Sequence, residues 1–206
     1  MTHIDRTSGN DESPTIAARS RSEFRQWLLL HAQNATECWL ELRRGQPKAD
    51  GSFYYLDAVE EALCFGWIDS TQKKVDGRLL QRFSPRQPKS AWSELNKERV
   101  RRLERLGLMT DSGRRVLPDM DPAHFVVDPD LKAALEAADA WETFCRFPTL
   151  YQRVRAYNVA FYKKRSPSTY RNALSHLVSA TRDGILFGQW DDYGRLGHDA
   201  AQEERK

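Results

Sequence analysis

The dipeptide Asp76-Gly77 lies between two extended runs and constrains the fold more than any other feature of the sequence. A two-residue Asp-Gly loop favours a type I′ turn, because both residues tolerate the left-handed backbone that this turn requires. The sequence therefore predicts an antiparallel hairpin in which residues 68–75 pair with residues 78–83.

The rest of the chain has mainly helical patterning. A helix is expected after Ser20, because Glu23 stands at capping-box spacing and apolar residues then recur every third or fourth position. Further helices are expected at about 55–66, 91–106, 112–116, 129–146, 149–164 and 167–182. On the first of these, Glu60 and Glu61 lie opposite the apolar face. Alternating polarity at 37–44 favours another strand.

These elements predict an α+β fold that is mostly helical. It has a small antiparallel sheet of about three strands (37–44, 68–75 and 78–83) and a C-terminal helical bundle. The expected organisation is a mobile arm (1–19), an α+β core (20–116), a helical part packed on that core (117–185) and a loosely held tail (186–206).

Composition excludes several classes of protein. The 206 residues carry a net charge of only +3, and the three cysteines are widely spaced, without zinc-ligand spacing. We therefore expect reduced thiols and neither a metal nor a cofactor. The chain has no apolar run long enough for a membrane span, and its first 20 residues do not resemble a secretory signal. A cytoplasmic location is expected.

The helix predicted at 91–106 places Arg99 within its apolar arc and Asn96 at the edge of that arc. A buried polar side chain needs a partner, so both residues are expected to have one on the inner face. Five charged residues point away in this projection: Glu94, Glu98, Arg101, Arg102 and Arg105.

Basic and aromatic residues gather between the hairpin and this helix. Asp69 lies diagonal to Arg82 across the predicted hairpin, which indicates an ion pair. Arginine forks near the beginning of a helix suit phosphate or carboxylate, and indole rings suit a planar group. The predicted anion-binding groove consists of Trp67, Asp69, Arg82, Arg86, Ser90, Trp92, Ser93, Asn96 and Arg99. The alternative is a polar network that only fixes the hairpin to the helix.

Two further patterns bear on function. A basic run (Arg153, Arg155, Lys163, Lys164, Arg165 and Arg171) extends a nucleic-acid footprint or forms a solvated helix face. Catalytic templates are mostly absent, so catalysis is not expected. If the protein is an enzyme, Asp69 is the acid/base candidate and Ser90 or Ser93 supplies a hydroxyl.

One combination of motifs resembles a known family. The runs at 62–69 (ALCFGWID), 82–86 (RFSPR) and 90–93 (SAWS), followed by Asn96, are similar to the bacterial YdeI/OmpD-associated family. The likeness covers roughly residues 24–116 and is poorer beyond them, where Thr169 and Arg171 stand in a divergent ending. The resemblance implies a link to protection against bacteriocins or cationic peptides, and it implies no catalytic residue.

Three hypotheses follow from the sequence. The first is a cytoplasmic binding protein for an anionic small molecule, nucleotide or nucleic acid. The second is a small-molecule enzyme centred on Asp69. The third is a protein-interaction module in a stress response.

Overall fold

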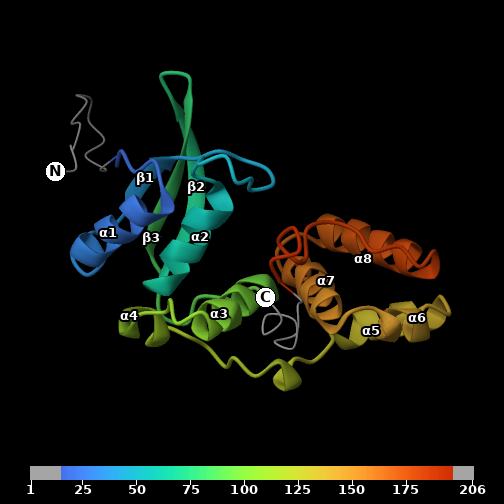
Figure 1. Ribbon diagram of the computed structural model, residues 1–206. Helices are drawn as coiled ribbons and strands as arrows, with labels where there is room; N and C mark the ends of the chain where they lie inside the picture. The colour runs from blue at the N-terminus through green and yellow to red at the C-terminus, as the bar shows by residue number, and fades with distance from the viewer. Residues whose placement is uncertain (1–14, 197–206) are drawn as a thin grey trace. The chain divides into compact units, whose positions relative to one another are not determined.

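The structure is a computed structural model that describes residues 15–196 (Figure 1). In chain order, the elements are α1 (Arg21–His31), β1 (Cys38–Glu41), α2 (Tyr55–Cys64), β2 (Trp67–Val75), β3 (Arg78–Pro85), α3 (Glu94–Arg105), α4 (Asp111–Arg114), a 3-10 turn (Pro122–His124), α5 (Pro129–Ala137), α6 (Trp141–Arg146), α7 (Thr149–Tyr162) and α8 (Pro167–Arg182). The α+β class with a three-stranded antiparallel sheet and a helical C-terminal region is confirmed.

The hairpin of β2 and β3 forms at the predicted turn. Asp76 and Gly77 have φ values of 49° and 81°, the left-handed conformation of a type I′ turn. Strand β3 lies between β1 and β2, and both pairings are antiparallel. An irregularity between Asp69 and Gln72 shifts the register, so that Asp69 lies opposite Phe83.

Two predicted helices have different bounds in the structure. Helix α3 begins at Glu94, a few residues later than expected. The single helix expected at 129–146 is divided into α5 and α6, because Asp139 adopts φ 52° and interrupts the helical path.

The chain divides into two compact units. Unit 1 contains the described residues up to 90 together with 100–118, and unit 2 contains 91–99 and the described residues from 119 onward. The division falls inside α3, whereas the sequence predicted a boundary near 116–117.

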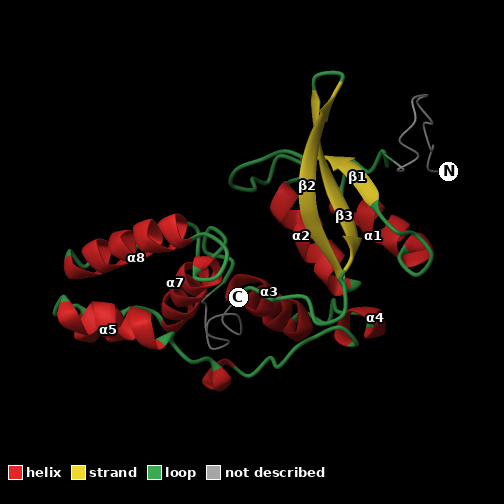
Figure 2. Cartoon of the chain, turned by 180° about the vertical axis from the view of Figure 1, so that it is seen from behind, coloured by secondary structure: helices red, strands yellow, loops and turns green. Residues whose placement is uncertain are grey.

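Unit 1 is built on the sheet, with α1 and α2 on one of its faces (Figure 2). Phe24 of α1 contacts Phe83 of β3 with ring centroids 5.5 Å apart, and Trp27 meets Trp67 edge-on at 5.8 Å. The segment before α1 extends this unit: Thr15 bridges to Trp39, and Ile16 is buried. The prediction of a mobile arm is therefore wrong for 15–19, and 1–14 lie outside the described residues.

Unit 2 has its own apolar core, built from α5, α6, α7 and α8. Its fully buried members include Leu131, Leu135, Phe144 and Leu177. The segment after α8 joins this unit, because Asp192 and Leu196 are buried. The prediction of a loosely held tail is wrong for 186–196, and 197–206 lie outside the described residues. Within the described part of the chain, no helix has the length and apolar character needed to cross a membrane.

Candidate functional site

Arg82, a central residue of the predicted groove, is bound to protein groups. Its Nε lies 2.6 Å from Oε2 of Glu37, and its Nη1 donates to the hydroxyl of Ser70 at 3.1 Å. Asp69 instead accepts a hydrogen bond from the hydroxyl of Tyr55. The predicted Asp69–Arg82 ion pair is wrong, because the shift of register within β2 removes the expected alignment.

The other predicted residues of unit 1 are largely enclosed. Trp67 is 1% exposed, and its indole Nε1 donates to the carbonyl of Ala32 at 3.2 Å. Arg86 is also buried, and its backbone N–H donates to the carbonyl of Gly66. Ser90 has a buried hydroxyl without a hydrogen-bond partner among the described residues. An indole buried in the core cannot stack on a ligand, so Trp67 has a structural role.

The predicted residues of unit 2 centre on Arg99. Its Nε and Nη2 bind the two carboxylate oxygens of Asp192 at 2.6 and 2.8 Å, and its Nη1 donates to Oδ1 of Asn96 at 2.7 Å. Trp92 is buried, and the Ser93 hydroxyl accepts the backbone N–H of Asn96. Arg99 and Asn96 thus have inner-face partners, as predicted, but the charge of Arg99 is already neutralised.

Five of these nine residues belong to unit 1 and four belong to unit 2. Arg82 and Arg99 each hold a protein carboxylate. Asp69 accepts the hydroxyl of Tyr55, the hydroxyl of Ser93 accepts the backbone N–H of Asn96, and the enzyme hypothesis stays a prediction. No metal-binding group of three or more acidic, histidine or cysteine side chains occurs among residues 15–196.

A buried cluster of charges in unit 1 was missed by sequence reasoning. Glu60 and Glu61 are 0% and 2% exposed and bind arginines from two other helices. Arg21 reaches both glutamates at 2.7 and 2.5 Å, Arg25 reaches Glu61 at 2.8 Å, and Arg102 reaches Glu60 at 3.1 Å. The predictions that these glutamates lie away from the core and that Arg102 points outward are wrong.

This cluster has the charge balance of a structural network. Asp57 lies 3.7 Å from Arg21 and supplies a third carboxylate against the three guanidinium groups. Three carboxylates thus face three guanidinium groups, and a buried charge must be paired to be tolerated. The spacing of Arg21 and Arg25, one helical turn apart, was the signal in the sequence for a shared acidic partner.

The basic run of unit 2 is paired in part. Arg153 lies 2.9 Å from Glu98 and 3.4 Å from Glu94, which is itself 2% exposed. Lys163 binds Asp128 and Asp130, and these contacts raise its pKa against the opposing effect of burial. Four residues of the run, Arg155, Lys164, Arg165 and Arg171, form no ion pair with another described residue.

A shallow groove follows one face of α8 in unit 2 and has a volume of about 360 Å³. Its wall on α5 is Ala134, and the α8 residues that line it are Arg171, Leu174, Ser175, Val178, Ser179 and Arg182. The spacing of three and four residues places these side chains on a single helical face. Leu174 and Val178 form a half-buried apolar floor, and both serines are exposed.

Two arginines mark the ends of this α8 groove. Arg171 and Arg182 are eleven residues apart, which is about 16 Å along a helix. Both are exposed, and neither forms an ion pair within residues 15–196. The neighbouring acidic residue on α5, Glu136, faces Lys132 at 3.7 Å. The groove is therefore apolar along its floor and positively charged at both ends.

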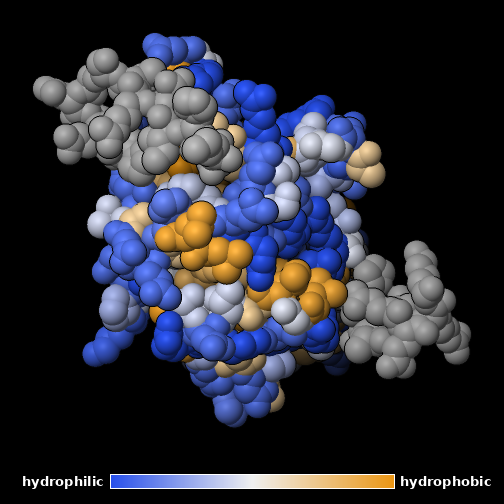
Figure 3. All heavy atoms as spheres, turned by 60° about the vertical axis from the view of Figure 1, so that its left-hand side comes forward, coloured by the Kyte–Doolittle hydropathy of each residue, from blue (hydrophilic) through white to orange (hydrophobic). Residues whose placement is uncertain are grey.

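Other apolar side chains on the surface are less organised. On the face drawn in Figure 3, they gather in small patches separated by hydrophilic residues. In unit 1, Leu29 and Leu30 of α1 are 63% and 72% exposed. The α8 groove combines a hollow with a positive charge at each end, so it is the better candidate for a binding surface.

The fold and the groove together define an α+β protein with a candidate binding surface. A family model described as a domain of unknown function, DUF8412, matches residues 16–116, which correspond closely to unit 1 and include the Glu60–Glu61 cluster. No curated protein and no solved structure gave a significant match. The resemblance to the YdeI/OmpD-associated family stays a prediction.

Proposed function

We propose that the chain is a binding protein for an anionic partner, with the α8 groove in place of the arginine groove that the sequence predicted. The observation that carries the proposal is the pair of arginines, Arg171 and Arg182, at the two ends of the α8 groove. Arg82 and Arg99 already hold carboxylates and support it less well.

The partner that fits this groove is an acidic, amphipathic helix. A shallow groove encloses too little of a small molecule to bind it tightly, whereas a helix can lay an apolar face along the floor. Carboxylates about three turns apart on that helix would reach Arg171 and Arg182, and the hydroxyls of Ser175 and Ser179 lie between them. A cytoplasmic location goes with this proposal and stays a prediction.

The test uses a fluorescent helical peptide with two glutamates about three turns apart and leucines between them, with a glutamine version as its neutral twin. Each substitution, Arg171→Gln or Arg182→Gln, should weaken binding about two- to fivefold, as exposed ion pairs contribute up to about 1 kcal/mol. The matched control is Lys164→Gln, which removes an exposed charge outside the groove. Binding should also weaken as salt rises.

Two results would overturn the proposal of a helical partner. One is equal affinity for the glutamate and glutamine peptides. The other is binding of a fluorescent oligonucleotide, sensitive to the double arginine variant, in the absence of peptide binding. That second result would assign the groove to nucleic acid.

A further inference from the structure

Arg155 of α7 has a guanidinium group without the partners that the other buried arginines have. Its Nε and Nη2 are shielded from solvent and have no hydrogen-bond partner among the described residues. The group lies against the rings of Tyr151 and Phe187, with its Cζ 5.6 and 4.8 Å from their centroids. Burial lowers the pKa of Arg155, and the nearby Tyr151 opposes this decrease.

These two nitrogens form the edge of an arginine that binds a carboxylate in a bidentate manner. Arg99 in the same unit uses the same pair, Nε and Nη2, to hold Asp192. Arg155 therefore presents the same edge with no carboxylate opposite it. A buried donor without an acceptor requires an explanation, and an absent ion is one of the few available.

The hydroxyl of Tyr151 adds a third group to this place. Tyr151 precedes Arg155 by one helical turn, and its buried hydroxyl donates to no described acceptor. Burial raises the pKa of Tyr151, and the backbone N–H of Phe187 and the charge of Arg155 oppose this increase. The environment is thus rich in hydrogen-bond donors and short of acceptors.

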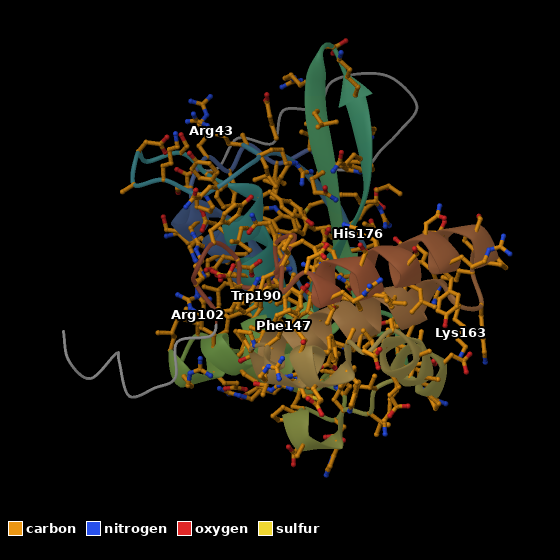
Figure 4. All side chains as sticks on the ribbon, turned by 90° about the vertical axis from the view of Figure 1, so that its right-hand side faces the viewer. Arg43, Arg102, Phe147, Lys163, His176 and Trp190 are labelled. Carbon is orange, nitrogen blue, oxygen red and sulfur yellow. The ribbon has the colours of Figure 1, made fainter. Side chains whose placement is uncertain are left out.

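Aromatic side chains cover the three groups. The rings of Phe187 and Trp190, from the segment after α8, meet the ring of Tyr151 edge-on. The ring centroid of His176 on α8 lies 4.3 Å from that of Phe187. Figure 4 labels His176 and Trp190. At Gly188 a Cβ atom would come within 2.7 Å of Nη2 of Arg155, so glycine permits the backbone to lie against the guanidinium.

We propose that Arg155 and Tyr151 form a binding site for a small monocarboxylate with an apolar, preferably aromatic, body. Two coplanar oxygens match Nε and Nη2, and the single cation matches a single negative charge. A phosphate dianion would retain an unpaired charge among the rings. Because the nitrogens are covered, entry requires movement of residues 185–190, for which Gly184 and Gly188 supply left-handed positions. The site is separate from the α8 groove and does not depend on the proposed function.

The test compares benzoate with benzyl alcohol, a neutral molecule of similar shape, by calorimetry and thermal unfolding of the full chain. Benzoate should bind saturably and raise the unfolding temperature, whereas benzyl alcohol should not. Arg155→Met should abolish binding, and Tyr151→Phe should weaken it several-fold. Arg155→Lys, which keeps the charge and loses the fork, should weaken it at least tenfold. The control Lys164→Gln, which removes an exposed charge outside the α8 groove, should bind benzoate like the unmodified chain.

The proposal is overturned if benzoate and benzyl alcohol produce the same shift, or if a folded Arg155→Met variant still binds benzoate. A second measurement covers the case in which that variant does not fold. In the unmodified chain, benzoate should move the NMR signal of the Arg155 Nε–H group strongly. An unchanged signal at a benzoate concentration that raises the unfolding temperature would place the ligand elsewhere and reject the site.

Discussion

Glu61 accepts hydrogen bonds from Arg21 and Arg25 while only 2% of its side chain is exposed. The substitution Glu61→Ala leaves both arginines facing an emptied, enclosed position. Breaking a buried ion pair lowers the free energy of unfolding by about 3–5 kcal/mol. We expect a loss near the lower end of this range, because both arginines are about one-third exposed and can turn toward solvent. Urea unfolding monitored by tryptophan fluorescence measures the loss.

The control for this prediction is Glu104→Ala. Glu104 binds Arg114, and their side chains are 35% and 46% exposed. Exposed pairs contribute about 0–1 kcal/mol, so this substitution should change the unfolding free energy little. Equal losses for the two variants would show that burial of the carboxylate does not decide its contribution.

His124 is the residue whose charge is set most directly by its neighbours near neutral pH. Its Nδ1 lies 2.6 Å from Oδ2 of Asp119, and this hydrogen bond, with the charges of Asp119 and Asp121, raises the pKa of the imidazole above 6.5. The hydrogen bond from the backbone N–H of Asp121 is the largest cause of the lowered pKa of Asp119, and the contact with His124 adds to it. Because the folded-state pKa of His124 is raised, its stabilising contribution is complete below pH 6.5 and is lost as pH rises through the folded value.

An NMR titration of His124 tests this prediction. Its midpoint should lie above 6.5 in the unmodified chain and move down in Asp119→Asn, because the substitution removes the negative charge. Asp111→Asn, which pairs with Arg114 instead, is the control and should leave the midpoint in place. Identical midpoints in all three proteins would contradict the assignment.

At the scale of elements, α4 is held against the C-terminal end of α2 by a close approach of backbones. A Cβ on Gly113 would lie 2.2 Å from the carbonyl oxygen of Cys64, which also accepts bonds from the backbone and hydroxyl of Thr110. Gly113→Ala must therefore displace α4, at a cost of about 1–3 kcal/mol for overpacking. Hydrogen exchange at the Thr110 amide should become faster.

Gly107→Ala provides the comparison for Gly113→Ala. A Cβ at Gly107 meets no other atom within 4 Å, but φ is +67°, so the added side chain causes only backbone strain. It should destabilise the chain without changing exchange at the Thr110 amide. Unchanged Thr110 exchange in Gly113→Ala would show that α4 accommodates the methyl group.

Local chemistry explains which elements the sequence predicts. The Asp76-Gly77 turn follows from φ preferences of two residues, and α7 and α8 follow from proline and capping signals at 148 and 166–167. The break at Asp139 lies in an alanine-rich run with high helix propensity, so nothing local indicates it. It coincides with burial of Ala140 and Phe144 in the core of unit 2, which is a tertiary effect.

The candidate site was harder to predict for the same reason. Helical periodicity correctly placed Arg99 on an inner face, but its partner Asp192 lies 93 residues later, in a segment expected to be loose. Glu60 and Glu61 look like solvent-facing acids until α1 and α3 supply arginines. Ion pairs between residues far apart in the sequence therefore decide which arginines remain available to a ligand. Helical periodicity gives no information about such pairs.

At the scale of the whole molecule, α3 belongs to two cores at once. Its residues 94–99 share contacts with unit 2, through Arg99–Asp192 and through Arg153, which lies near Glu94. Residues 100–105 belong to unit 1, where Val100 and Leu103 are fully buried. Each unit has its own core, so we expect local opening of one unit to leave the other protected.

Hydrogen exchange of two full-length variants tests this independence. Asp192→Asn keeps a residue that tolerates the left-handed backbone at φ 50° but removes the charge opposite Arg99. Exchange should become faster in 91–99 and 185–196, and stay unchanged in β2 and β3. Glu61→Gln should have the opposite distribution of effects. Hydrogen exchange should become faster in α1 and α2 and stay unchanged in α7 and α8. If either variant speeds exchange in both sets equally, α3 couples the two cores into a single cooperative unit.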